Sequence, residues 1–149
     1  LLLSAYEQDI DRNTFLYPGA VDAVEALRDA GFYVGVCTNK PERLAEILLA
    51  RLGVRDLFGS LVGADTLTVR KPDPAPYRLS VEQAGGLVER SMLIGDTETD
   101  RKTGRAAGVP VALVTFGPEG AGVARLAPEA LLENFTDLPA LAERFLPRD

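Results

Sequence analysis

The sequence predicts one α/β domain built on a parallel sheet with helices on both faces. Short, continuously apolar segments alternate with segments whose apolar residues recur at helical spacing, and glycine or proline separates most of them. Unbroken apolar strands are typical of a parallel sheet that is buried on both sides. The length of 149 residues is usual for a single domain.

The elements follow from these periods in chain order. A first helix is expected over residues 20–28, a second between Pro41 and Gly53, and a third ends at Gly85. In the second helix, Leu44, Ile47, Leu48 and Arg51 recur at helical spacing. Two further helices are expected at about 98–107 and 138–145, and strands at 32–38, 60–63, 91–95 and 110–116, with a short apolar piece at 131–135.

Composition excludes several classes of function. The chain has no histidine, which rules out histidine-dependent phosphatases, serine hydrolase triads and HExxH zinc sites within it. The net charge of −6 disfavours a nucleic-acid surface, and no apolar run approaches the ~20 residues of a membrane span. Cys37 is the only cysteine, so no internal disulfide can form, and a reducing, cytoplasmic compartment is expected.

Polar residues with complementary chemistry follow three of the predicted strands. Thr38 and Asn39 follow the first, Lys71 follows the second at some distance, and Asp96 and Asp100 follow the third. Because ligands of open α/β sheets bind at the carboxyl ends of the strands, these side chains should meet at one edge. Together they could hold a phosphoryl group and a hard divalent cation.

Each of these residues also has a purely structural interpretation. Thr97 and Asp100 could form the capping box of the helix that follows, although capping and chemistry are compatible. Lys71 could be a solvated loop lysine, but Pro72 and a second proline nearby stiffen its loop and favour a fixed position for the ammonium. Thr38 and Asn39 are ordinary residues ahead of a helix.

A different chemistry, a thiol mechanism, must also be considered, because Cys37 and Arg43 match the C-x₅-R motif of cysteine-dependent phosphatases. Pro41 and Glu42 lie inside this loop, and neither suits a cradle of backbone N–H groups around an anion. Cys37 also ends an apolar strand. We therefore expect it to be a small buried hydrophobic residue.

The motifs CTNKP (37–41), RKPDP (70–74), IGDTETD (94–100) and AAGVP (106–110), in this order, resemble the haloacid dehalogenase-like phosphatases, in particular the phosphoglycolate phosphatase group. The resemblance implies a Rossmann-like three-layer core, a Mg²⁺ cofactor and a small phosphorylated metabolite as substrate. It implies that Thr38 and Asn39 bind the phosphoryl oxygens and that Lys71 balances their charge. It also implies that Asp96 binds Mg²⁺ and that Asp100 supports the metal or the lysine.

One family motif is missing. The DxDxT segment, which carries the aspartate that attacks phosphorus, appears nowhere in the 149 residues. In the family it lies upstream, on the central strand, and is followed by a helical cap. Leu2, Leu3, Tyr6 and Ile10 form a helical stripe, so residues 1–16 are interpreted as the end of such a cap and residues 17–149 as a core without its first strand.

The resulting expectation is a Mg²⁺-dependent phosphatase of small phosphomonoesters, with phosphoglycolate favoured and the nucleophile upstream, so that these residues alone would be inactive. A phosphosugar mutase or a pyrophosphatase of the same superfamily is the alternative within the fold. A non-catalytic α/β binding module is a further alternative, if the natural chain begins at Leu1.

Overall fold

The computed structural model describes residues 2–4, 19–116 and 120–146. Its six strands form one parallel sheet in the order β3-β2-β1-β4-β5-β6. The strands are β1 (Leu2–Ser4), β2 (Gly35–Cys37), β3 (Ser60–Val62), β4 (Leu93–Gly95), β5 (Val111–Val114) and β6 (Ala130–Leu132). The predicted α/β class with a parallel sheet is therefore confirmed.

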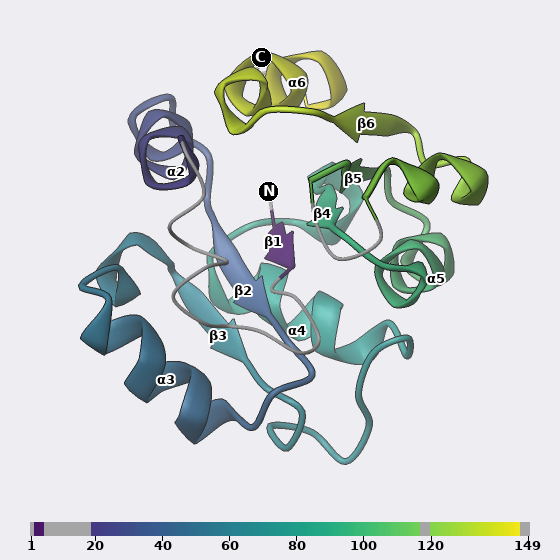
Figure 1. Ribbon diagram of the computed structural model, residues 1–149. Helices are drawn as coiled ribbons and strands as arrows, with labels where there is room; N and C mark the ends of the chain where they lie inside the picture. The colour runs from purple at the N-terminus through teal and green to yellow at the C-terminus, as the bar shows by residue number, and fades with distance from the viewer. Residues whose placement is uncertain (1, 5–18, 117–119, 147–149) are drawn as a thin grey trace.

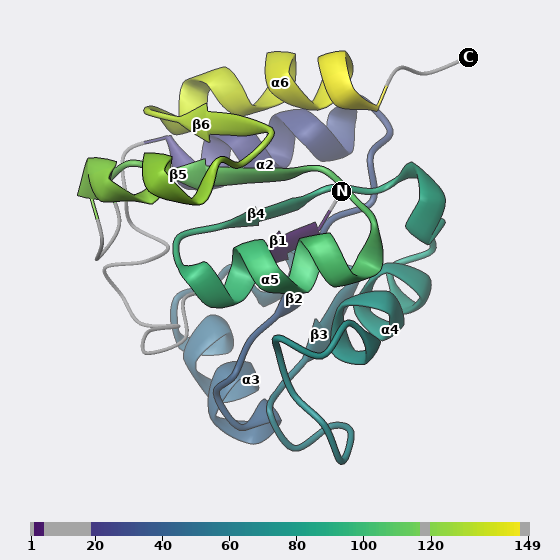
Figure 2. The same ribbon diagram turned by 90° about the vertical axis from the view of Figure 1, so that its right-hand side faces the viewer.

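Helices cover both faces of this sheet, as Figures 1 and 2 show. One face carries α2 (Ala20–Asp29), α3 (Glu42–Arg51) and α6 (Leu138–Phe145), and the other carries α4 (Ala75–Gln83) and α5 (Glu98–Ala107). Four short 3₁₀ segments lie at Arg55–Leu57, Val88–Arg90, Gly120–Leu126 and Phe135–Asp137. None of the helices in the described ranges is long and apolar enough to cross a membrane.

Each face has its own apolar core. Leu27, Leu49 and Leu138 bring α2, α3 and α6 onto one side of the sheet, and Tyr77 and Leu93 belong to the cluster on the other side. The strands are buried along their whole length from β2 to β5, which explains why they appear in the sequence as apolar runs without alternation.

The N-terminal segment differs from the prediction. Leu2–Ser4 form a strand between β2 and β4, so the predicted helix is wrong for these residues and the central position of the sheet is filled. An empty position would leave the backbone N–H and C=O groups of two inner strands without partners, and this cost favours extended pairing over a short helical pattern. Residues 5–16 of the predicted cap segment lie outside the described residues, and that assignment stays a prediction.

The buried face of α3 does not coincide with the series Leu44, Ile47, Leu48 and Arg51 that indicated the helix. Ala45 and Leu49 are completely buried, whereas Leu44 is 57% exposed and Ile47 is 40% exposed. The apolar residues of this helix fit two overlapping helical series, and packing against the sheet selects the series that contains Ala45 and Leu49.

Candidate active site

The site lies at the carboxyl edge of the sheet, where the register brings the ends of four neighbouring strands together. Cys37 at the end of β2 is opposite Val62 at the end of β3, and also opposite Ser4 at the end of β1. Gly95 ends β4 on the other side of β1. The loops that follow β2, β3 and β4 therefore emerge along one edge, as the strand order predicts.

Lys71 and Asp100 form a buried ion pair at this edge. Lys71 Nζ donates to Asp100 Oδ1 at 2.8 Å, and both side chains have no exposed surface. Burial alone would lower the pKa of Lys71, but the charge and hydrogen bond of Asp100, with a contribution from Asp96, hold that pKa above its ordinary value. Lys71 is therefore a fixed cation at neutral pH, and the solvated-loop interpretation is wrong.

Asp100 is held by the turn between β4 and α5. Its second oxygen, Oδ2, accepts from the backbone N–H of Asp96 at 3.0 Å and from Thr97 Oγ1 at 3.4 Å. A Cβ at Gly95 would collide with the Asp100 carboxyl, so this close approach requires glycine. The alternative interpretation, a capping box, is not formed, because Thr97 makes no side-chain cap hydrogen bond and Asp100 accepts from the N–H of Asp96 instead.

Asp96 is the side chain at this edge that best fits a divalent cation. Asp96 is completely buried at the end of β4. Two carboxylates, Asp96 and Asp100, therefore lie near a single ammonium, that of Lys71. Both oxygens of Asp100 already accept hydrogen bonds within the protein, so Asp100 is suited to supporting the site. Mg²⁺ is commonly held by one or two carboxylates together with water and substrate phosphate, and Asp96 fits this pattern.

The described part of the chain holds no group of three His, Cys, Asp or Glu residues arranged around one metal position. Dedicated cages made only of protein side chains are unusual for Mg²⁺.

Thr38 and Asn39 lie on the β2 side of the edge. Thr38 is buried, and its Oγ1 accepts from the backbone N–H of Lys40 at 3.1 Å, so the hydroxyl proton is directed away from this bond and can be donated. Asn39 Nδ2 donates to the backbone oxygen of Lys71 at 3.2 Å. Asn39, Lys71, Asp100 and Asp96 are thus connected in series, and Thr38 is their neighbour along the chain.

Cys37 does not have the environment of a nucleophile. The side chain is fully buried, and burial raises the pKa of the thiol to about 11 although Lys71 opposes this shift. A catalytic cysteine needs a lowered pKa and access to its substrate. The expectation that Cys37 is a small buried hydrophobic residue is confirmed.

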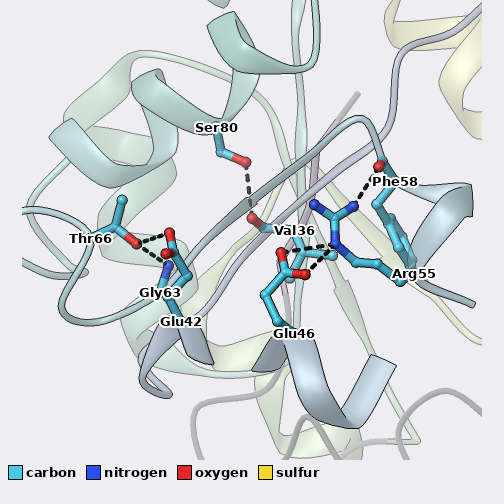
Figure 3. Close-up of polar contacts among 8 residues, drawn as sticks. All are labelled: Val36, Glu42, Glu46, Arg55, Phe58, Gly63, Thr66 and Ser80. Carbon is cyan, nitrogen blue, oxygen red and sulfur yellow. Dashed lines mark hydrogen bonds and ion pairs between the residues drawn. The ribbon is translucent and has the colours of Figure 1, made fainter. Parts of the chain in front are cut away.

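Sequence reasoning missed the turn that follows β3. Thr66 Oγ1 accepts from the backbone N–H of Gly63 and donates to Glu42 Oε1, both at 2.8 Å, as Figure 3 shows. The available signal was a glycine at the end of a strand followed three residues later by threonine, which is a local turn pattern. Its contact with Glu42 across the sheet edge has no local signal.

Comparison with known proteins agrees with this fold. The model of the family described as haloacid dehalogenase-like hydrolase matches residues 4–108. A phosphoglycolate phosphatase from Rhodospirillum rubrum is 41% identical over 136 residues, which are 91% of this chain and 56% of that protein. The chain belongs to the haloacid dehalogenase-like hydrolases.

Two solved structures extend the comparison. A Haemophilus somnus protein described as a predicted phosphoglycolate phosphatase superposes with a TM-score of 0.76 at 27% identity, covering 84% of this chain and 56% of that one. A Thermotoga maritima protein described as a candidate β-phosphoglucomutase gives 0.74 at 25% identity, covering 85% and 60%. The chain spans little more than half the length of these proteins.

Proposed function

We propose that this chain is the core of a Mg²⁺-dependent phosphatase that hydrolyses a small phosphomonoester, with 2-phosphoglycolate favoured. The buried Lys71–Asp100 pair beside Asp96 carries the proposal, because fixed charges of both signs at a sheet edge suit a metal-bound phosphoryl group. The similarity to the phosphoglycolate phosphatase of R. rubrum supports the choice of substrate.

Each residue then has a distinct role. The Thr38 hydroxyl and the Asn39 amide contact the phosphoryl oxygens, and the Lys71 ammonium offsets their charge. Asp100 fixes the position of Lys71, and Asp96 binds Mg²⁺. The metal, when bound, neutralises charge on the phosphoryl group.

The hydrolysis itself is proposed to pass through an aspartyl-phosphate. A carboxylate oxygen attacks phosphorus, the substrate alcohol leaves with a proton, and water then cleaves the acyl phosphate to return the carboxylate and release phosphate. The DxDxT motif that would supply this carboxylate is absent from the 149 residues, so we place the nucleophile upstream of them. The single cysteine supports a reducing, cytoplasmic location.

A phosphosugar mutase is the second candidate, and the resemblance to the T. maritima protein favours it. The charged groups described above serve either reaction, because both need a held phosphoryl group. The difference is whether the phosphoryl group is transferred to water or to a second hydroxyl of a sugar.

The decisive assay measures phosphate release by the natural polypeptide that contains this chain. The substrates are 2-phosphoglycolate, glucose 1-phosphate and pyrophosphate, each with Mg²⁺ or excess chelator. We expect Mg²⁺-dependent release from 2-phosphoglycolate, and its loss in Asp96→Asn and Lys71→Ala. Full activity in chelator would refute the proposal, and conversion of the sugar phosphate to its isomer would select the mutase.

A further inference from the structure

The loop that carries Thr38 is attached along its length to the loop that follows β3. The backbone N–H of Thr38 donates to the carbonyl of Val62 at 2.9 Å, and the N–H of Ala64 donates to the carbonyl of Lys40 at 2.7 Å. These bonds extend the pairing of β2 and β3 beyond the strand ends. The position of the Thr38 loop therefore depends on how the β3 loop is held.

Side chains of the β3 loop also hold the start of α3. Asp65 Oδ1 accepts from the backbone N–H of Glu42 at 2.8 Å, and the hydroxyl of Thr66 bridges the Gly63 N–H and Glu42 Oε1. In Figure 3, dashed lines join the Thr66 hydroxyl to both Gly63 and Glu42. Thr66 thus links the end of β3 to the far end of the loop that begins at Thr38.

The two loops are packed without space between them. A Cβ at Gly63 would collide with the backbone of Glu42 and would approach the Lys40 carbonyl at 2.8 Å. Because the backbones are already in contact, a change in the turn at Gly63 displaces residues 40–42. Thr38 lies two residues before this contact, and its hydroxyl is oriented by the N–H of Lys40.

We propose that Thr66 is a positioning residue that holds the Thr38 hydroxyl in place for the phosphoryl group. Its hydroxyl accepts from the backbone N–H of Gly63 and donates to Glu42 at the start of α3. Among the contacts described for these two loops, no other side chain makes both bonds. The inference rests on the proposed phosphate-binding role of Thr38. It adds a residue that acts through Glu42 and Gly63 without touching the substrate.

The test compares Thr66→Val, which keeps the shape of the side chain and removes its hydroxyl, with Thr66→Ser, which restores it. Glu46→Gln is the matched control. Glu46 lies on α3, as Glu42 does, but it pairs with Arg55 at a distance of 2.9 Å and does not contact the turn that follows β3 (Figure 3). Calorimetry measures the binding of inorganic phosphate at saturating Mg²⁺, and of Mg²⁺ alone. All measurements are made well below the melting temperature of each variant.

We expect Thr66→Val to weaken phosphate binding about fivefold, as the loss of one well-placed hydrogen bond implies. Mg²⁺ binding should be unchanged, since Asp96 lies on the β4 loop, and Thr66→Ser and Glu46→Gln should bind phosphate normally. Unchanged phosphate binding in Thr66→Val, or an equal loss of phosphate and Mg²⁺ binding, would overturn the inference.

Thr38→Val separates this inference from the proposed function. If Thr38→Val loses phosphate binding while Thr66→Val keeps it, only the positioning role fails. If Thr38→Val binds phosphate normally, or the unaltered protein binds none, the proposed function fails and the positioning role fails with it.

Discussion

Lys71 Nζ lies 2.8 Å from Asp100 Oδ1, and neither side chain has exposed surface. A buried ion pair contributes little net stability compared with apolar residues of the same size, because both charges lose their hydration. Removing one partner is costly, however, since the other charge is left buried without compensation. This asymmetry gives a way to separate the structural role of the pair from its role in binding phosphate.

Lys71→Met should destabilise the protein by about 3–5 kcal/mol, because the Asp100 carboxylate stays buried without its ammonium. In Lys71→Met/Asp100→Asn no charge of the pair remains and the Asn oxygen can still accept from the Asp96 N–H, so most of that loss should be recovered. Urea unfolding measures stability, and calorimetry should find phosphate binding lost in both variants. A double variant as unstable as the single one would contradict this account.

The pair also has a defined pH dependence. The pKa of Lys71 is raised above its ordinary value of 10.5, so the folded state holds this proton more tightly than the unfolded state. Its contribution is fully present below 10.5 and is lost as pH rises through the raised value. The difference in free energy of unfolding between the unaltered protein and the double variant should be constant from about pH 7 to 9. Above about pH 10.5 the unaltered protein should lose stability relative to the double variant. A loss already complete below pH 9 would show that the pKa is not raised.

Asp96→Asn should abolish stabilisation by Mg²⁺. A ligand that binds only the folded state stabilises it by about 2.7 kcal/mol at a hundred times its dissociation constant, so the melting temperature of the unaltered protein should rise when Mg²⁺ replaces chelator. Removing the Asp96 charge relieves its repulsion with Asp100 but also removes its attraction to Lys71, so in chelator this variant should melt close to the unaltered protein.

The matched control for Asp96→Asn is Glu98→Gln. Glu98 lies in the same motif, but its side chain is exposed and pairs with Lys102 at 3.7 Å. This variant should respond to Mg²⁺ as the unaltered protein does. If Asp96→Asn still gains the full increase in melting temperature, Asp96 is not a metal ligand.

Gly95→Ala should disrupt the site although it adds only one methyl group. The new Cβ meets the Asp100 carboxyl, which would have to move away from Lys71 and from the Asp96 N–H. Overpacking of this kind costs about 1–3 kcal/mol, and phosphate and Mg²⁺ binding should both weaken. Gly122→Ala, where a Cβ meets nothing within 4 Å, should change neither stability nor binding.

The sequence allowed the fold class and most elements to be predicted, because both depend on local patterns. Apolar runs gave β2 to β5, and the glycine at 108 marked the end of α5, where it adopts a left-handed conformation. The strand Leu2–Ser4 was not predicted, since three residues carry little pattern of their own and only the open position between β2 and β4 decides their conformation.

The site was predictable as a set of residues but not as a set of contacts. Thr38, Lys71 and Asp96 follow strands whose ends must meet, so their convergence could be inferred. The Lys71–Asp100 contact joins residues 29 positions apart, and which oxygens of Asp100 it occupies depends on side-chain geometry. The hydrogen bond from Thr66 to Glu42 likewise joins residues 24 positions apart, and no local sequence pattern indicates it.

Cys37 provides a test against the thiol mechanism. With a pKa of about 11 and no exposed surface, its thiol should react with iodoacetamide at pH 8 more than about a hundredfold slower in the folded protein than in urea. Cys37→Ala should keep phosphate binding and Mg²⁺-dependent phosphate release, and should lose only about 1 kcal/mol of stability from the small cavity among Tyr77 and its neighbours. Rapid alkylation of the folded protein, together with loss of phosphate release in Cys37→Ala, would instead identify the thiol as the nucleophile.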